Sequence, residues 1–108
     1  MNSSIVIALP KIDDAKKIRT ILNRHGFSVA AVCSTASTAL ASMSELDGGI
    51  LICGYKLSDR YYRDVLDDIP SCFEMLLLAS ERVIAEAPAS VLTVEMPMKV
   101  SDLINTVD

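Results

Sequence analysis

Few side chains in this sequence have types and spacings that could do chemistry. The 108 residues include three cysteines, Cys33, Cys53 and Cys72, and one histidine, His25. No Cys-x-x-Cys pair or Cys/His spacing typical of a zinc site occurs. A single histidine offers no Ser/His/Asp or Cys/His catalytic set. We therefore predict no enzyme, no cofactor and no metal site, and we expect buried, reduced thiols in a cytoplasmic protein.

Two neighbouring carboxylates, Asp13 and Asp14, are the nearest approach to an acidic pair. They fall at the start of a helical pattern, where the helix dipole stabilises negative charge. We interpret them as helix-start residues. Lys11, just before them, has two open interpretations: a solvated loop residue, or a cation built into a pocket. Cys53 ends an apolar run, which favours an inert thiol over a reactive one.

Short apolar runs alternate with amphipathic stretches along the whole chain. The runs predict strands at Ser4–Ala8, Phe27–Cys33, Ile50–Cys53, Glu74–Ala79 and Val91–Val94. The stretches predict helices at Lys11–His25, Ser34–Glu45, Asp59–Leu66, Ser80–Glu86 and Val100–Val107, the fourth of them with a loop as the alternative. Strands separated by helices pair in parallel through right-handed crossovers. The sequence thus predicts one α/β domain over residues 1–108, a doubly wound (βα)5 sheet of order 2-1-3-4-5 (flavodoxin-like).

In such a sheet, the functional site lies at the carboxyl ends of the strands. Four segments fall there: Leu9–Ile12, Gly54–Asp59, Ala79–Arg82 and Glu95–Met98. The loop after the first strand has no Gly-rich phosphate cradle.

The charge balance and the lengths of the apolar runs argue against two classes of partner, nucleic acids and membranes. The net charge is −4, and no basic cluster exceeds the pair Lys16–Lys17. A nucleic-acid-binding surface is normally basic, so we expect this domain to bind neither DNA nor RNA itself. No apolar run approaches the roughly 20 residues that span a bilayer, so we expect no membrane association.

Three segments resemble response-regulator receiver domains. The tract I-L-I-C-G-Y-K-L-S-D at 50–59 resembles the third strand, which delivers a phospho-accepting Asp. Met75–Ala79 with Ser80 resembles the fourth strand and its hydroxyl residue, and Glu95–Met98 resembles the fifth strand with its Lys-Pro pair. The resemblance implies a magnesium-dependent pocket at the carboxyl edge of the sheet.

The residues at those pocket positions have lost that chemistry. Pro10 and Lys11 stand where the acidic pair is expected, and Gly54 stands at the acceptor position. The remaining positions hold Ala79 for the hydroxyl and Met96 for the lysine, while Pro97 matches the proline. Oxygen ligands hold Mg²⁺, and none of these side chains supplies one. The sequence therefore predicts a degenerate, non-catalytic pseudo-receiver.

A narrower resemblance is to the amino-terminal half of ANTAR-type antitermination regulators. It is carried by I-V-I-A-L-P-K-I-D-D-A-K-K-I-R at 5–19, G-Y-K-L-S-D at 54–59, F-E-M-L-L-L-A-S at 73–80 and M-P-M-K-V-S-D-L-I-N-T-V at 96–107. It implies RNA binding only through a carboxyl-terminal domain absent here. The sequence stops at Asp108 within a helical pattern, so we expect an N-terminal domain of a longer regulator, with a free-standing protein as the alternative.

Such a module would act through protein contacts, with a partner or as a homodimer. The expected face is formed by the fourth helix, the fifth strand and the last helix. Its candidate residues are Arg82, Val83, Glu95, Val100 and Leu103. Two alternatives stay open: a phosphorelay receiver with a displaced acceptor, Ser58 or Asp59, and a flavodoxin-like sensor of a small ligand.

Overall fold

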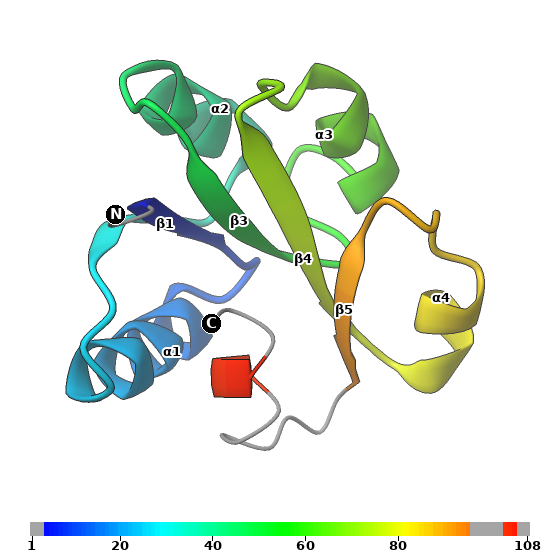
Figure 1. Cartoon of the computed structure of the whole chain (residues 1–108). Helices are drawn as coiled ribbons and strands as arrows, with labels where there is room; N and C mark the ends of the chain where they lie inside the picture. Colours follow the sequence, from blue (N-terminus) through cyan, green and yellow to red (C-terminus); the bar gives the residue numbers. More distant parts are fainter. Residues whose placement is uncertain (1–3, 96–102, 106–108) are drawn as a thin grey trace.

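A five-stranded parallel sheet forms the centre of the molecule (Figure 1). The structure is a computed structural model that describes residues 4–95 and 103–105. The strands are β1 (Ser4–Ala8), β2 (Val29–Cys33), β3 (Gly49–Gly54), β4 (Phe73–Ala79) and β5 (Leu92–Glu95). Their order is β2-β1-β3-β4-β5, and every neighbouring pair is parallel. The predicted fold class and strand order are confirmed.

Helices cover both faces of the sheet (Figure 1). The helices are α1 (Ile12–Arg24), α2 (Ala36–Ser44), α3 (Tyr62–Asp68) and α4 (Glu81–Ala85), and residues 103–105 are also helical. Among the described helices, none is long and apolar enough to cross a membrane.

Successive strand residues point to opposite faces, and this divides the core in two. On one face, Ile52, Leu76 and Leu78 pack with α1 and with Leu103. On the other face, Cys53 and Ala79 belong to the cluster that α2 and α3 cover. A residue's place in the strand alternation therefore decides which cluster it joins.

Two helix ends match the sequence pattern closely. Gly26 has a φ of +85°, and its N–H donates to Asn23 O while the next N–H donates to Leu22 O, which closes α1. At the start of α2, Thr35 is the N-cap, and its hydroxyl accepts a hydrogen bond from the N–H of Thr38.

The third helix differs from the sequence prediction. It begins at Tyr62, not Asp59. Residues 58–61 instead form a loop in which Leu57 N–H donates to Arg60 O at 2.7 Å and Tyr62 N–H donates to Tyr55 O at 3.0 Å. These two hydrogen bonds close a turn before the helix, which begins three residues later than predicted.

Candidate functional site

The end of β3 meets the segment after β1 at the carboxyl edge of the sheet. Ala8 pairs in register with Cys53, which brings the following residues Leu9 and Pro10 beside Gly54. A Cβ atom built on Gly54 would lie 3.2 Å from Leu9 Cδ2 and 3.4 Å from Pro10 Cδ. Two apolar side chains therefore crowd the place where a side chain at position 54 would begin.

The neighbour of Gly54 on β4 is Leu78, which sequence reasoning missed. Gly54 pairs in register with Leu78, whose side chain is buried on the α1 face. Ala79, assigned to this site from the sequence, packs into the opposite cluster. The physical reason is strand alternation: one residue further along β4 points to the other face. Ser80 follows as the N-cap residue of α4, without a side-chain capping hydrogen bond.

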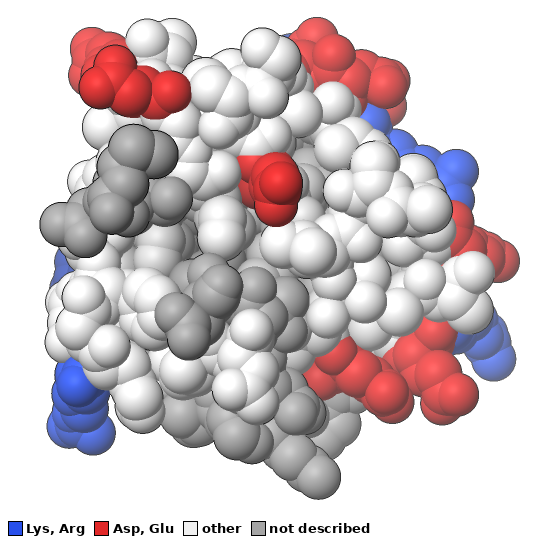
Figure 2. Space-filling view, in the orientation of Figure 1, with Lys and Arg blue, Asp and Glu red and all other residues white. Residues whose placement is uncertain are grey.

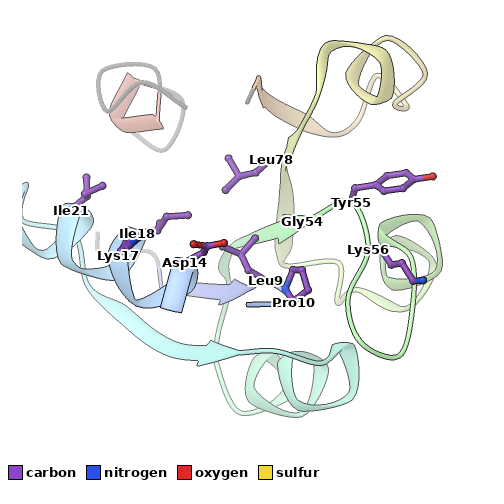
Figure 3. A pocket seen from close by; sticks show the side chains of 10 residues that line it. All are labelled: Leu9, Pro10, Asp14, Lys17, Ile18, Ile21, Gly54, Tyr55, Lys56 and Leu78. Atoms are coloured by element: carbon purple, nitrogen blue, oxygen red, sulfur yellow. The ribbon is translucent and has the colours of Figure 1, made fainter. Parts of the chain in front are cut away.

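A cavity of about 460 Å³ opens beside Gly54, between the end of the sheet and α1 (Figure 3). Its described lining consists of Leu9, Pro10, Asp14, Lys17, Ile18, Ile21, Gly54, Tyr55, Lys56 and Leu78. Most of these side chains are apolar. The carboxyl edge thus carries a hydrophobic hollow.

Three charged side chains line this cavity. Asp14 and Lys17 come from α1, and Lys56 comes from the loop after β3. The Nζ of Lys56 lies 5.3 Å from the centroid of the Tyr61 ring, within cation–π range. Lys11, considered as a built-in cation, is the exposed N-cap residue of α1 and is not part of the described lining.

The described lining of the cavity beside Gly54 offers a Mg²⁺ ion one carboxylate, that of Asp14. Magnesium requires oxygen ligands, usually one or two carboxylates with waters or phosphate oxygens. Among residues 4–95 and 103–105, no group of three or more His, Cys, Asp or Glu side chains could hold a metal. Asp13 and Asp14 lie in the first turn of α1, as expected, and Asp14 is the one carboxylate in the described lining of the cavity.

Asp59 is engaged at the start of α2. Its Oδ1 accepts a hydrogen bond from Ala36 N–H at 2.7 Å, and its Oδ2 accepts bonds from the N–H and hydroxyl of Ser37 at 3.1 and 3.0 Å. The Ala36 amide is the main reason why the pKa of Asp59 lies below its usual range, and the Ser37 donors add to it. Both oxygens therefore serve helix capping, which lowers their availability as nucleophiles.

The cysteines divide into two kinds. Burial raises the pKa of the Cys53 thiol to about 12, and burial also raises the pKa of Cys33 despite an opposing hydrogen bond with Ser42. These two thiols are buried, as expected, and carry little thiolate. Cys72 is exposed, contrary to the expectation, because it lies in the turn before β4.

The histidine ends α1. His25 is its C-cap residue, and the Nδ1 atom lies 2.9 Å from Ile21 O. His25 thus lies at the end of the helix, where the predicted range Lys11–His25 also ends.

The predicted interaction face is only partly at the surface. Arg82 and Glu95 are exposed, and Val83 is partly buried. Leu103 has no exposed surface and belongs to the α1-side core. Val100, Met96 and Pro97 lie outside the described residues.

A tyrosine cluster after β3 is a feature that the sequence pattern did not single out. Tyr55 and Tyr61 are 47% and 45% exposed, and their ring centroids lie 5.4 Å apart edge to face. With the buried Tyr62, they line a hollow of about 370 Å³ that also touches Val83 and Glu86. This hollow is therefore continuous with the predicted face at α4.

Arg63 connects the tyrosine cluster to α4. Its Nε donates to the Tyr62 hydroxyl at 3.1 Å, and a terminal nitrogen donates to Glu86 O at 2.6 Å. The hydrogen bond with Tyr62 raises the pKa of Arg63.

On the molecular face drawn in Figure 2, the basic side chains lie in separate groups at the margin, without a continuous basic patch.

Solved structures similar to this chain are response-regulator receiver domains, and the fold is of that CheY-like class. The receiver domain from Clostridium thermocellum matches with a TM-score of 0.84 and 16% identity over 97% of this chain and 90% of that one. The response regulator PhyR from Brucella abortus matches with a TM-score of 0.80 and 19% identity. The anti-anti-sigma factor PhyR from Bartonella quintana matches with a TM-score of 0.80 and 17% identity.

Both PhyR matches cover 99% of this chain, but the chain spans only about half the length of the PhyR proteins, 48% and 46%. No protein-family model matches the sequence, and no curated protein matches it.

Proposed function

We propose that this chain is a non-catalytic, receiver-like signalling module that works in the cytoplasm through protein contacts. In this proposal, it regulates an attached or partner RNA-binding antitermination effector, and it does so without accepting a phosphoryl group. Homodimerisation or docking of a partner on the α4–β5 face would transmit the signal.

The observation that carries the proposal is the environment of Gly54. Phosphoryl transfer to a carboxylate needs a nucleophile and a cation that neutralises the phosphoryl oxygens. Position 54 has no side chain, and a Cβ atom there would lie in contact with the apolar side chains of Leu9 and Pro10. The alternative acceptor Asp59 has both oxygens in hydrogen bonds to α2.

The similar structures support the role of protein contacts. One PhyR is named an anti-anti-sigma factor, a name that describes action on another protein. The exposed tyrosines next to Val83 give this chain a surface of the composition that interfaces favour, since Tyr and Arg are enriched in binding hot spots.

The proposal is tested by intact-mass spectrometry after incubation with acetyl phosphate and Mg²⁺. A phosphorylatable receiver domain in a parallel reaction shows that the donor is active. We expect no phosphoryl adduct on this chain. An adduct that disappears in Asp59→Asn would instead establish a displaced acceptor.

The α4 face is tested by charge reversal. Sedimentation velocity over a concentration series measures self-association of the wild type, Arg82→Glu and the α1 control Arg24→Glu. If the face forms a homodimer, Arg82→Glu weakens association and Arg24→Glu does not. A wild type that stays monomeric leaves the heterologous partner as the proposed occupant.

A further inference from the structure

The cavity beside Gly54 combines an apolar wall with two opposite charges from one turn of α1. We propose that it binds a small zwitterion that carries one large apolar group, of which an aromatic α-amino acid is the simplest example. This inference does not depend on the proposed function, because it concerns a ligand and not phosphoryl transfer or a protein partner.

The two charges are placed for a ligand with an ammonium and a carboxylate close together. Asp14 and Lys17 are three residues apart on α1, and residues at this spacing share a helix face with Cβ atoms about 5–6 Å apart. Both side chains line the cavity (Figure 3). Within the described part of the chain, they form no ion pair with each other. Asp14 can therefore accept hydrogen bonds from an ammonium while Lys17 donates to a carboxylate.

The rest of the lining suits an apolar side chain. Leu9, Ile18 and Leu78 are nearly buried, with 7%, 5% and 4% of their surface exposed, and they form the inner wall. The exposed ring of Tyr55 also lines the cavity and can pack against an aromatic ligand.

The volume of the cavity is also appropriate for a small-molecule ligand. About 460 Å³ lies within the range of roughly 300–1,000 Å³ that is usual for small-molecule sites, which are mostly apolar with a few polar groups that fix orientation. Gly54 is one of the residues that line this space. For a ligand of about a dozen heavy atoms, a Kd on the order of 1 mM is expected.

The test is a titration of the ¹⁵N-labelled full chain, followed by amide NMR shifts. The probes are L-phenylalanine, N-acetyl-L-phenylalanine, which lacks the ammonium, and L-phenylalaninamide, which lacks the carboxylate. We expect saturable shifts at Gly54, Tyr55 and α1, with L-phenylalanine binding about two- to fivefold more tightly than either analogue. That factor is the size of one partly exposed charge contact.

Two variants test which side chain binds each charged group of the ligand, and substitutions of two neighbouring residues serve as controls. Asp14→Asn removes the preference over the N-acetyl analogue, and Lys17→Gln removes the preference over the amide. Asp13→Asn and Lys16→Gln lie on the same helix but outside the described lining, so they keep both preferences. Unchanged shifts in β3 and β4 of the free variants show that they remain folded.

Three results would overturn the proposal. The first is the absence of saturable shifts with L-phenylalanine at about 20 mM, well above the expected Kd. The second is equal affinity for all three probes, which identifies a purely apolar hollow. The third is tighter binding of either analogue, which identifies a ligand of single charge.

Discussion

Restoring a carboxylate at position 54 is the most informative perturbation of the site. Gly54→Asp places a charged side chain beside Leu9, Pro10 and Leu78. We compare it with Gly54→Ala and Gly54→Asn, which separate the effects of the Cβ atom, the polar group and the charge. If the pocket is dismantled, the carboxylate finds neither a cation site nor a phosphoryl group there.

The expected magnitudes follow from the contacts. Gly54→Ala adds a Cβ atom 3.2 Å from a flexible leucine methyl group, and removing a strand glycine gains about 0.5–1 kcal/mol, so the net effect stays within about 1 kcal/mol. Gly54→Asn adds a poorly paired amide and costs about 1–3 kcal/mol more. For Gly54→Asp, we expect contact with Leu9, Pro10 and Leu78 to raise the pKa of the new carboxyl more than the exposed Lys17 and Lys56 lower it, and each pKa unit costs about 1.4 kcal/mol at pH 7.

The stability penalty of Gly54→Asp should depend on pH in one direction. The folded-state pKa of the carboxyl introduced by Gly54→Asp would exceed the unfolded value of about 3.9, so the penalty is fully present at pH values above the raised pKa. It disappears as the pH falls through the folded-state pKa towards the unfolded one. Urea unfolding at about pH 7 and about pH 4.5 measures this, and the stability gap between the Asp and Asn variants is expected to shrink at the lower pH.

The reasoning is refuted by a Gly54→Asp variant that is as stable as Gly54→Ala at pH 7. It is equally refuted if millimolar Mg²⁺ raises the stability of Gly54→Asp and not that of Gly54→Asn. A ligand that binds only the folded state stabilises it by mass action, so such a gain would reveal a working metal site.

Three further predictions concern the fold around the site. Gly49→Ala is expected to lose about 3 kcal/mol or more of unfolding free energy in urea titrations, because its Cβ would overlap Ser4 O at a φ of +154°; a loss under about 1 kcal/mol would contradict this contact. The pKa of Asp59 is lowered in the folded state, so its stabilising effect is present above about pH 4 and is lost as the pH falls through that lowered value. In Asp59→Asn, the unfolding free energy should therefore fall less steeply at acid pH than in the wild type. An unchanged fall at acid pH would argue against the capping role. Alkylation of the native chain at about pH 7.5, read by mass, should modify Cys72 quickly and Cys53 only on unfolding; rapid modification of Cys53 would contradict its burial.

The sequence predicts this fold well where local pattern and tertiary structure agree. The apolar run Ser4–Ala8 is β1 as predicted, and the amphipathic stretch before Gly26 is α1. The start of α3 was wrong because the partners of Asp59 lie 22 and 23 residues earlier in the chain, and a local pattern does not contain such a contact.

The candidate site stays a prediction, and the structure shows where its residues lie relative to one another. Gly54 and Pro10 lie together as expected, since parallel strands end at one edge. Leu78 was missed because the residue of β4 that lies beside Gly54 depends on how β4 aligns with β3. That alignment is a tertiary contact, which the local sequence pattern does not contain. The cluster of Tyr55 and Tyr61 depends on a turn that the sequence does not mark with glycine or proline.

We propose that the magnesium and phosphoryl pocket of a receiver domain is dismantled in this chain while the receiver-like scaffold remains. Amide NMR of the ¹⁵N-labelled wild type, titrated with Mg²⁺ and then with beryllium fluoride, tests it most directly. We predict no saturable shifts at Leu9, Gly54 or Ala79 at millimolar Mg²⁺, with or without beryllium fluoride. Saturable shifts at these three residues that require both Mg²⁺ and beryllium fluoride would contradict the account.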